Sequence, residues 1–391
     1  MTVFEQSEYL ARLERTKDRM EKAGLEVLIV VDPANMNYLT GYDAHSYYVE
    51  QAAVLVLDAP EPLLVVRKMD VACARFTTWL SPENLLGWPE ELVQSRTKHP
   101  FQFLTAALRE RGWGNKTIGL EMDAPYFTPR SYEVIRAGLP HARFDDARLL
   151  VSWVRCVKSP AEIAMMKKAG VITQQVVQTA VDAIQVGVRE CDAAAAVLHA
   201  QASGTDEYGG DLPAFPPLFC AGEKASAPHL TWTADRFQDE TAINMELAAA
   251  FKRYHCPLAR TLYLGRRPPQ KLTDMAKWTI DGLNAELAAI GPGVTCEEVD
   301  QAFRKAVAPA GITKESRTGY SVGLGYPPDW GEHTCSMRAG DRTVLEPNMT
   351  FHIIAGMWMD TWGFEISESV VVTRTGYELL THYPRELLIK G

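Results

Sequence analysis

Apolar and polar positions along this chain alternate between two spacings, and these predict helices and strands in turn. Within residues 8–23, Leu10, Leu13 and Met20 recur at helical spacing, and the apolar run of residues 25–31 predicts a buried strand. Further β segments are predicted at 52–57, 62–66 and 117–121, with helices near 69–74 and 100–111. Strands that alternate with helices indicate an α/β domain over residues 1–155.

The second half opens on a helix start. Ser159 and Glu162 form a capping box, and Pro160 stands at the first helical position. A long helix to about residue 184 is therefore expected, with later helices at 190–203, 271–290 and 295–308. Strands are predicted at 215–220, 349–355 and 364–373, whereas residues 316–344, rich in glycine and proline, predict loops. The whole predicts an α+β protein with domains 1–155 and 156–391.

Residues 243–264 predict a β-hairpin in the second domain. A mostly apolar run ends at Ala250, Lys252 and Arg253 form a basic turn, and the chain resumes at Tyr254. His255 and Cys256 are neighbours on the returning segment. Because neighbours on a strand point to opposite faces, they are not expected to act as a Cys–His pair.

Composition narrows the class of protein. With 47% hydrophobic and 23% charged residues among 391, the chain has the material for two soluble domains. A net charge of −9 argues against a general nucleic-acid binder. No apolar run approaches the ~20 residues of a membrane span, and the first residues lack a signal-peptide pattern. Seven scattered cysteines are typical of reduced thiols, so we expect a cytoplasmic protein. From the net charge and the lack of a long apolar run, we expect neither nucleic-acid nor membrane partners.

Several motifs occur in an order that resembles one enzyme family. The chain is similar to the aminopeptidase P, prolidase and creatinase superfamily, whose catalytic half has the pita-bread fold. The resemblance implies a creatinase-type N-terminal domain and a pita-bread C-terminal domain. The segments that carry it are 32–35, 38–41, 155–163, 215–217, 227–229, 260–261, 319–324, 346–349 and 376–378.

Metal-dependent members of this superfamily use two aspartates, a histidine and two glutamates as ligands. The matching positions here hold Glu246, Pro257, Tyr320, Ile354 and either Ser367 or its neighbour Glu368. Proline and isoleucine have no side-chain donor, and tyrosine is a poor ligand for these metals. The resemblance therefore implies no metal, no other cofactor and no metallopeptidase activity.

The same segments resemble the metal-free branch that contains creatinase and ectoine hydrolase. That likeness implies hydrolytic opening of a cyclic amidine that carries a carboxylate, with ectoine as the small zwitterionic substrate and hydroxyectoine as a further candidate. It implies His229 as the base, since a neutral imidazole suits deprotonation of water near neutral pH. Candidate carboxylate partners of the amidinium are Glu246, Glu365 and Glu368, with Glu332 as a further candidate.

Other residues are expected to contact the substrate. Tyr320, Tyr326 and Trp330 are candidates for walls around a cationic ring. Arg260 could pair with the substrate carboxylate or with a buried acid, and His255 and His352 suit the core as well as the site. The resemblance also implies a homodimer in which a loop containing Tyr48 closes the partner's site.

Three other functions fit parts of the pattern. A creatinase-type amidinohydrolase would also act on a zwitterion with a delocalised cation. An Xaa-Pro peptidase would need the metal ligands that this chain lacks. A non-enzymatic pita-bread binding module would also have lost these ligands, but such modules are expected to carry charged extensions.

Overall fold

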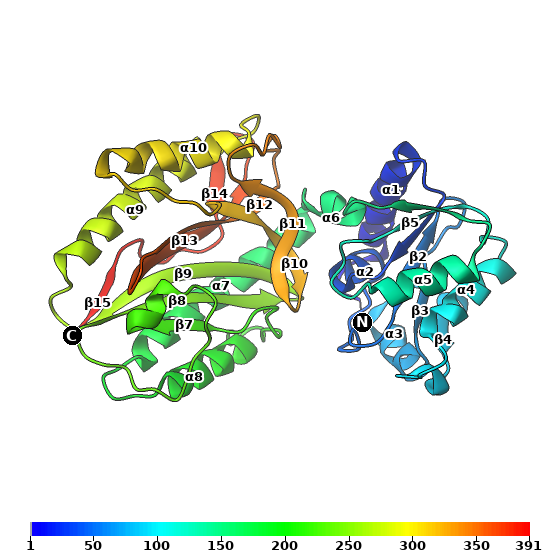
Figure 1. Cartoon of the computed structure of the whole chain (residues 1–391), viewed down its shortest axis with the longest axis horizontal. Helices are drawn as coiled ribbons and strands as arrows, with labels where there is room; N and C mark the ends of the chain where they lie inside the picture. Colours follow the sequence, from blue (N-terminus) through cyan, green and yellow to red (C-terminus); the bar gives the residue numbers. More distant parts are fainter. Residues whose placement is uncertain (1) are drawn as a thin grey trace. The chain divides into compact units, whose positions relative to one another are not determined.

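The computed structural model describes residues 2–391, which form two compact units, one ending at Arg155 and the other starting at Cys156 (Figure 1). The first unit is a mixed six-stranded sheet in the order β4-β3-β2-β1-β5-β6 with helices packed around it. Its strands are β1 Val27–Val30, β2 Ala52–Val56, β3 Leu63–Arg67, β4 Leu85–Trp88, β5 Thr117–Leu120 and β6 Arg143–Asp146. Its helices are α1 Gln6–Lys22, α2 Pro33–Thr40, α3 Val71–Thr77, α4 Pro100–Glu110, α5 Pro129–Gly138 and α6 Leu150–Arg155.

Helix α2 begins directly after Asp32, whose residue type favours turns as well as helix starts. The Asp32 side chain accepts the Asn35 N–H at 3.0 Å, Pro33 occupies the first turn, and Gly41 ends the helix at φ 80°. Residues that favour turns also favour helix starts, because both satisfy a free N–H with a side-chain oxygen. The sequence pattern was therefore compatible with either structure.

The second unit is a nine-stranded sheet with helices on its outer surfaces (Figure 1). The main order is β14-β13-β12-β10-β9-β8-β7; β11 pairs with β10 and β15 with β9. Helix α7 packs on β8 and β9, and α9 packs on β12 and β13. The helices are α7 Pro160–Ala183, α8 Glu190–Ser203, α9 Gln270–Ala289 and α10 Cys296–Val307. The strands are β7 Leu218–Ala221, β8 Thr241–Phe251, β9 Tyr254–Leu264, β10 Gly319–Tyr326, β11 Asp329–Met337, β12 Thr350–Trp358, β13 Gly363–Val372, β14 Tyr377–Leu379 and β15 Leu388–Lys390.

Two hairpins frame the interior of this unit. The predicted hairpin is β8–β9, and its turn residues Lys252 and Arg253 both have positive φ, as a tight two-residue turn requires. The second hairpin, β10–β11, corrects the prediction of loops over residues 316–344. Its glycines and prolines suggested irregular chain, but cross-strand pairing and burial of apolar residues such as Val322 and Leu324 outweigh this preference.

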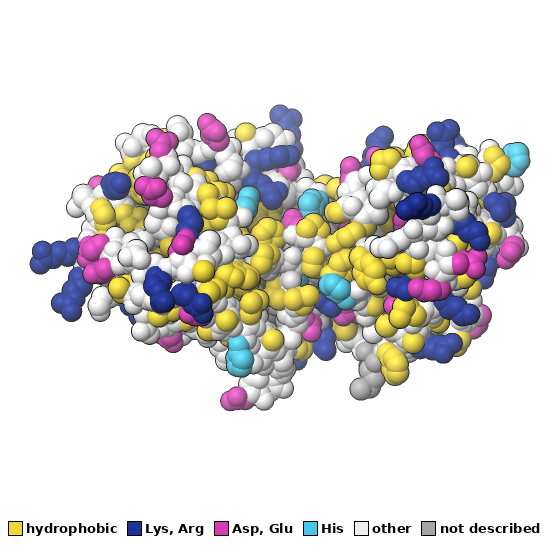
Figure 2. All heavy atoms as spheres, turned by 60° about the horizontal axis from the view of Figure 1, so that its bottom comes forward, with side chains coloured by type: hydrophobic (Ala, Val, Ile, Leu, Met, Phe, Trp, Pro, Cys, Tyr) yellow, Lys and Arg dark blue, Asp and Glu magenta, His cyan; other side chains and the backbone are white. Residues whose placement is uncertain are grey.

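Surface properties add two observations. On the face shown in Figure 2, Lys and Arg side chains are interspersed with Asp and Glu, so neither sign of charge dominates that face. Within residues 2–391, no helix combines the length and the hydropathy that crossing a membrane requires.

Candidate active site

A cavity of about 580 Å³ lies inside the second unit, where the two hairpins and the β12–β13 pair meet. Acidic, basic and aromatic side chains from separate elements converge on it. The lining residues are Phe215, Pro228, His229, Glu246, Lys314, Ser316, Arg317, Tyr320, Asp329, Trp330, Ile354, Gly356, Trp358 and Glu365.

Two buried carboxylates face this cavity from different strands. Glu246 lies on β8, where it pairs with Leu218 of β7 and Ala259 of β9. Glu365 lies on β13, and its N–H donates to the Thr261 hydroxyl at 2.8 Å, which ties this strand to β9. Both side chains are less than a tenth exposed. The sheet thus fixes two acids at one cavity, away from bulk water.

Burial disfavours the ionised form of both carboxyl groups. Desolvation and the charge of Asp329 raise the pKa of Glu246 to about 7, although a hydrogen bond from Tyr320 opposes the rise. Desolvation and the charge of Glu246 raise the pKa of Glu365 well above its usual value, although Lys314 opposes this. Two like charges in a desolvated site cannot both form cheaply. A cation placed beside them would lower both pKa values.

Aromatic rings and a hydrogen-bonded chain form one wall. The Trp330 indole N–H donates to the Tyr320 hydroxyl at 2.9 Å, and His352 Nδ1 lies 2.8 Å from the same oxygen. On its other side, His352 Nε2 lies 2.6 Å from Ser367 Oγ. Phe215 packs 5.1 Å from the Trp330 ring, between centroids. This wall can contact a flat cationic ring.

Two cations lie in the segment that leads into β10. Lys314 donates to the Gly356 carbonyl at 2.7 Å, and burial lowers the pKa of Lys314 to about 8 despite the attraction of Glu365. Arg317 is exposed, lies 4.4 Å above the Tyr320 ring and donates to Ser336 Oγ. Neither residue was among the candidates from the sequence, because no motif or periodicity marks them. The cavity therefore offers positive as well as negative charge.

His229 lies in the turn that follows the 3-10 helix η4 Gly222–Ser226, and it lines the same cavity. Its side chain is exposed, so the imidazole is open to solvent. Asp329, on β11, was also missed by the sequence reasoning. Burial pushes the pKa of Asp329 upward, but hydrogen bonds from His333 and the Gly331 N–H hold it below its usual value. Asp329 is therefore charged at neutral pH.

Other predicted residues of this unit lie outside the lining of the cavity. Arg260 donates to Glu368 at 2.9 Å and to the Ser367, Tyr383 and Pro384 carbonyls, and Arg385 donates to the same carboxylate oxygen. This buried network holds the chain end against β9 and β13, and it occupies both Arg260 and Glu368. The alternative of a buried acid as the partner of Arg260 matches the geometry.

Three more predicted residues also have partners within the fold. Glu332 accepts from Lys158 at 2.6 Å in a buried ion pair. His255 Nε2 accepts the Ala214 N–H at 2.8 Å, and burial lowers the pKa of His255 to about 4. Tyr326 is buried under the Arg253 guanidinium, 4.9 Å from its ring centroid. Tyr48 belongs to the first unit, where its side chain is 64% exposed.

The positions that match the metal ligands of metal-dependent relatives do not supply a dinuclear metal centre. Of these five positions, Pro257 and Ile354 have no side-chain donor atom, and Ser367 is engaged with His352. Throughout residues 2–391, no group of three or more His, Cys, Asp or Glu side chains is arranged to hold a metal ion. The residues present do not fit the metal pair.

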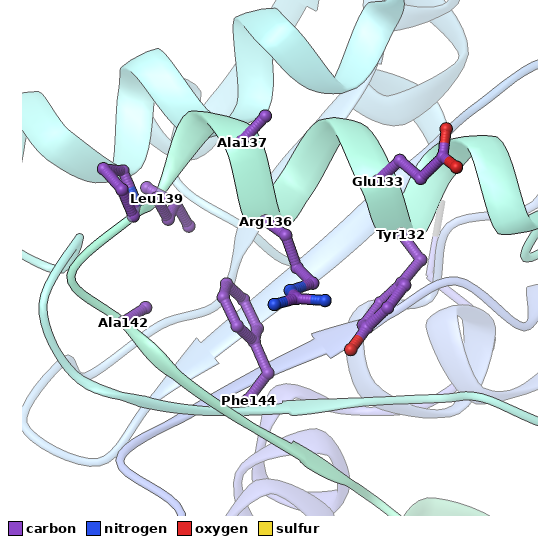
Figure 3. A pocket seen from close by; sticks show the side chains of 8 residues that line it. Tyr132, Glu133, Arg136, Ala137, Leu139, Ala142 and Phe144 are labelled. Carbon is purple, nitrogen blue, oxygen red and sulfur yellow. The ribbon is translucent and has the colours of Figure 1, made fainter.

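A hollow of about 500 Å³ in the first unit provides a contrast (Figure 3). There Arg136 lies 5.5 Å from the Tyr132 ring centroid, with Phe144 on its other side (Figure 3). Glu133 turns away and pairs with Arg130. These side chains stack without bringing acids and bases together, so the cavity of the second unit is the candidate active site.

Comparison with known proteins agrees with the architecture. Residues 164–374 match the family model of metallopeptidase family M24, and residues 12–157 match the creatinase/prolidase N-terminal domain. A dipeptidase from Pyrococcus horikoshii has a TM-score of 0.82 at 21% identity, covering 97% of this chain and 99% of that one. PepE dipeptidase of Mycobacterium ulcerans has a TM-score of 0.80 at 22% identity, with 99% of both chains covered. These likenesses confirm the predicted α+β fold, with its creatinase-type and pita-bread domains.

Curated relatives are more similar in sequence. An uncharacterized hydrolase/peptidase of Sinorhizobium fredii, y4tM, is 45% identical over 387 residues, which are 99% of this chain and 98% of that protein. The ectoine hydrolase of Halomonas elongata is 38% identical over 394 residues, again covering 99% of this chain and 98% of the relative. The chain therefore belongs to the hydrolases of metallopeptidase family M24.

Proposed function

We propose that this protein hydrolyses the ring of a cyclic amidine that carries a carboxylate, with ectoine as the candidate substrate. The observation that carries the proposal is the buried pair Glu246 and Glu365 in a cavity that also holds Lys314 and Arg317. Such a cavity complements a zwitterion whose cation is delocalised over two N–H groups. The 38% identity to an ectoine hydrolase supports the same substrate class.

The carboxylates suit the cationic end of this substrate. An amidinium presents two N–H groups, and charge-assisted hydrogen bonds to carboxylates are stronger than neutral ones. Binding of the cation offsets the desolvation that raises the pKa values of Glu246 and Glu365, so both carboxylates can ionise beside it. The ring would lie against Trp330 and Tyr320, and its carboxylate would face Arg317.

Hydrolysis then needs a base and an acid. Water adds to the amidinium carbon while His229 takes one of its protons, and the imidazolium returns that proton to the ring nitrogen as its C–N bond breaks. The hydroxyl proton of the tetrahedral adduct passes to the departing amine as the amide carbonyl forms. The products are an amide and an ammonium, so atoms and charge balance. Glu246, with a pKa of about 7, is a second group able to exchange protons near neutral pH. Because the amidinium already carries the positive charge that a metal would supply, the mechanism is proposed to be metal-independent.

Incubation of the purified protein with ectoine in excess chelator, followed by proton NMR, tests the proposal. We expect ring opening to an N-acetylated diaminobutyrate, about 10²-fold or more slower in His229→Ala. A matched control, His199→Ala, removes an exposed histidine of α8 and should leave the rate unchanged. Urea release from creatine, or cleavage of an Xaa-Pro dipeptide only after addition of manganese, would replace this proposal with a rival one.

The homodimer implied by the family resemblance is part of the proposal. Tyr48, 64% exposed on the first unit, is proposed to contact a second copy of the chain. Light scattering should give twice the 43.5 kDa mass of one chain, and a monomer with full activity would contradict the dimer.

A further inference from the structure

The hydrogen bonds around Tyr320 specify where its hydroxyl proton goes. The phenol oxygen accepts the Trp330 indole N–H at 2.9 Å, and it lies 2.8 Å from His352 Nδ1. The Glu246 carboxylate lies next to this cluster, with its Oε1 3.9 Å from His352 Nδ1, and Tyr320 acts to lower the pKa of Glu246. A phenol has one proton and two lone pairs. The tautomer of His352 therefore decides whether Tyr320 donates to the histidine or to Glu246.

His352 is neutral, because burial and the nearby Arg317 charge lower its pKa to about 3. One ring nitrogen therefore carries a proton and the other accepts. Its Nε2 lies 2.6 Å from Ser367 Oγ, and that oxygen already accepts the Ala259 N–H at 2.6 Å. If Nε2 carried the proton, the serine oxygen would receive two donors. Its own proton would then lack an acceptor, since Ser367 Oγ has no third partner within residues 2–391.

The opposite arrangement satisfies every group. Ala259 N–H donates to Ser367, the serine hydroxyl donates to His352 Nε2, and Nδ1–H donates to Tyr320. With Trp330 on its second lone pair, the phenol keeps its own proton for an acceptor at the cavity, where Glu246 is the neighbouring carboxylate. A buried hydroxyl without an acceptor is destabilising, which favours this direction of the hydrogen-bonded chain.

We propose that Ser367 and His352 are positioning residues that hold Tyr320 as a hydrogen-bond donor to Glu246. This hydrogen-bonded chain runs from a main-chain amide of β9 through side chains of β13, β12 and β10 to the carboxylate on β8. The sheet therefore sets its direction. The fixed donor stabilises the ionised carboxylate that the amidinium needs, and it also keeps the carboxylate in one orientation. This role rests on the proposed function only for its catalytic consequence; the proton positions follow from the fold alone.

The groups that face Glu246 also include charges that act on it directly. These are Asp329 on β11 and Glu365 on β13, whereas Lys314, Arg317 and His229 line the same cavity. His352, a member of the hydrogen-bonded chain, also lies 3.9 Å from Glu246, between Nδ1 and Oε1. None of the other groups lies between Ser367 and Tyr320, so a variant at Ser367 leaves them in place. Substitution of Ser367 therefore tests the hydrogen-bonded chain without removing a group that lines the cavity.

Nitrogen-15 NMR of histidine-labelled full-length protein tests the proton positions without any substrate. The signal of His352, one of nine histidines, is assigned by its loss in His352→Gln. We expect a neutral ring with its proton on Nδ1 in the wild type and a shift toward Nε2–H in Ser367→Ala. Ser369→Ala is the matched control, since this buried serine of β13 donates to the Pro257 carbonyl instead. A wild-type His352 protonated on Nε2 would overturn the proposal.

The catalytic consequence has its own readout. Loss of the donor raises the pKa of Glu246, so the acid limb of the kcat/KM profile should move up by about one pH unit in Tyr320→Phe. Ser367→Ala should move it in the same direction, and Ser369→Ala should not. A lower rate with an unmoved limb in both Tyr320→Phe and Ser367→Ala would indicate a merely structural role and would refute the inference. Absence of ring opening in the wild type would refute the proposed function while leaving the NMR result standing.

Discussion

Replacing Glu246 by glutamine should make the protein more stable at alkaline pH although it removes a residue of the candidate active site. In the folded protein the pKa of Glu246 rises from 4.5 to about 7. The folded state therefore binds a proton that the unfolded chain releases. Glutamine has a similar shape and carries no charge, so it removes this penalty.

The sign and size follow from proton linkage. Below pH 4.5 both states hold the proton and Glu246 imposes no penalty. As the pH rises from 4.5 to about 7, the unfolded state is progressively favoured, and above 7 the full penalty applies. At about 1.4 kcal/mol per pKa unit, this penalty is about 3 kcal/mol. The Glu246→Gln variant should gain about this much over the wild type at pH 8, and little at pH 4.5.

Urea denaturation at pH 5 and pH 8 measures this difference. The quantity to compare is the free energy of unfolding of the second unit, variant minus wild type, at each pH. Glu207→Gln is the control, because it removes the same charge from an exposed loop and should show no pH-dependent gain. If Glu246→Gln is no more stabilising at pH 8 than at pH 5, then the carboxylate is not held in the desolvated state described here.

Three further predictions concern other parts of the second unit. Arg317→Gln should raise KM about tenfold for the carboxylate substrate and leave kcat within about twofold. The KM of an analogue whose carboxylate is capped as an amide should stay unchanged. An equal rise in KM for both compounds would show that the substrate carboxylate binds elsewhere. Lys158→Met should lower the free energy of unfolding by about 3–5 kcal/mol, because Glu332 is left buried without its cation; a loss under about 1 kcal/mol in urea denaturation would contradict this. Dialysis against chelator should leave turnover unchanged. A loss of turnover that added manganese restores would show that a metal is required.

Much of the fold could be predicted from local pattern. The capping box at Ser159 and Glu162 forms as expected, and α7 begins at Pro160. The β8–β9 hairpin was expected from a mostly apolar run that ends at Ala250 and a basic turn at Lys252 and Arg253. The β10–β11 hairpin could not be predicted in this way, because its pairing depends on contacts with β9 and β12 that lie far away in the sequence.

The candidate site was predictable only in part. Residue type and family position identified Glu246, Glu365 and His229, and all three line one cavity. Glu365 and Glu368 are three residues apart on β13, so their side chains face opposite sides, and only Glu365 lines the cavity. The positions of Lys314 and Arg317 depend on how an irregular segment packs, which no periodicity records. Likewise, the partners of Arg260 and Glu332 are set by packing between distant segments.

The central claim is that this cavity holds an organic cation between Glu246 and Glu365. A crystal structure of the His229→Ala variant soaked with ectoine tests it most directly. We predict electron density for the ring against Trp330 and Tyr320, with the amidinium within hydrogen-bond distance of Glu246 or Glu365 and the carboxylate toward Arg317. Density for a metal ion at Glu246, or a ring bound with its carboxylate toward the two glutamates, would contradict the account.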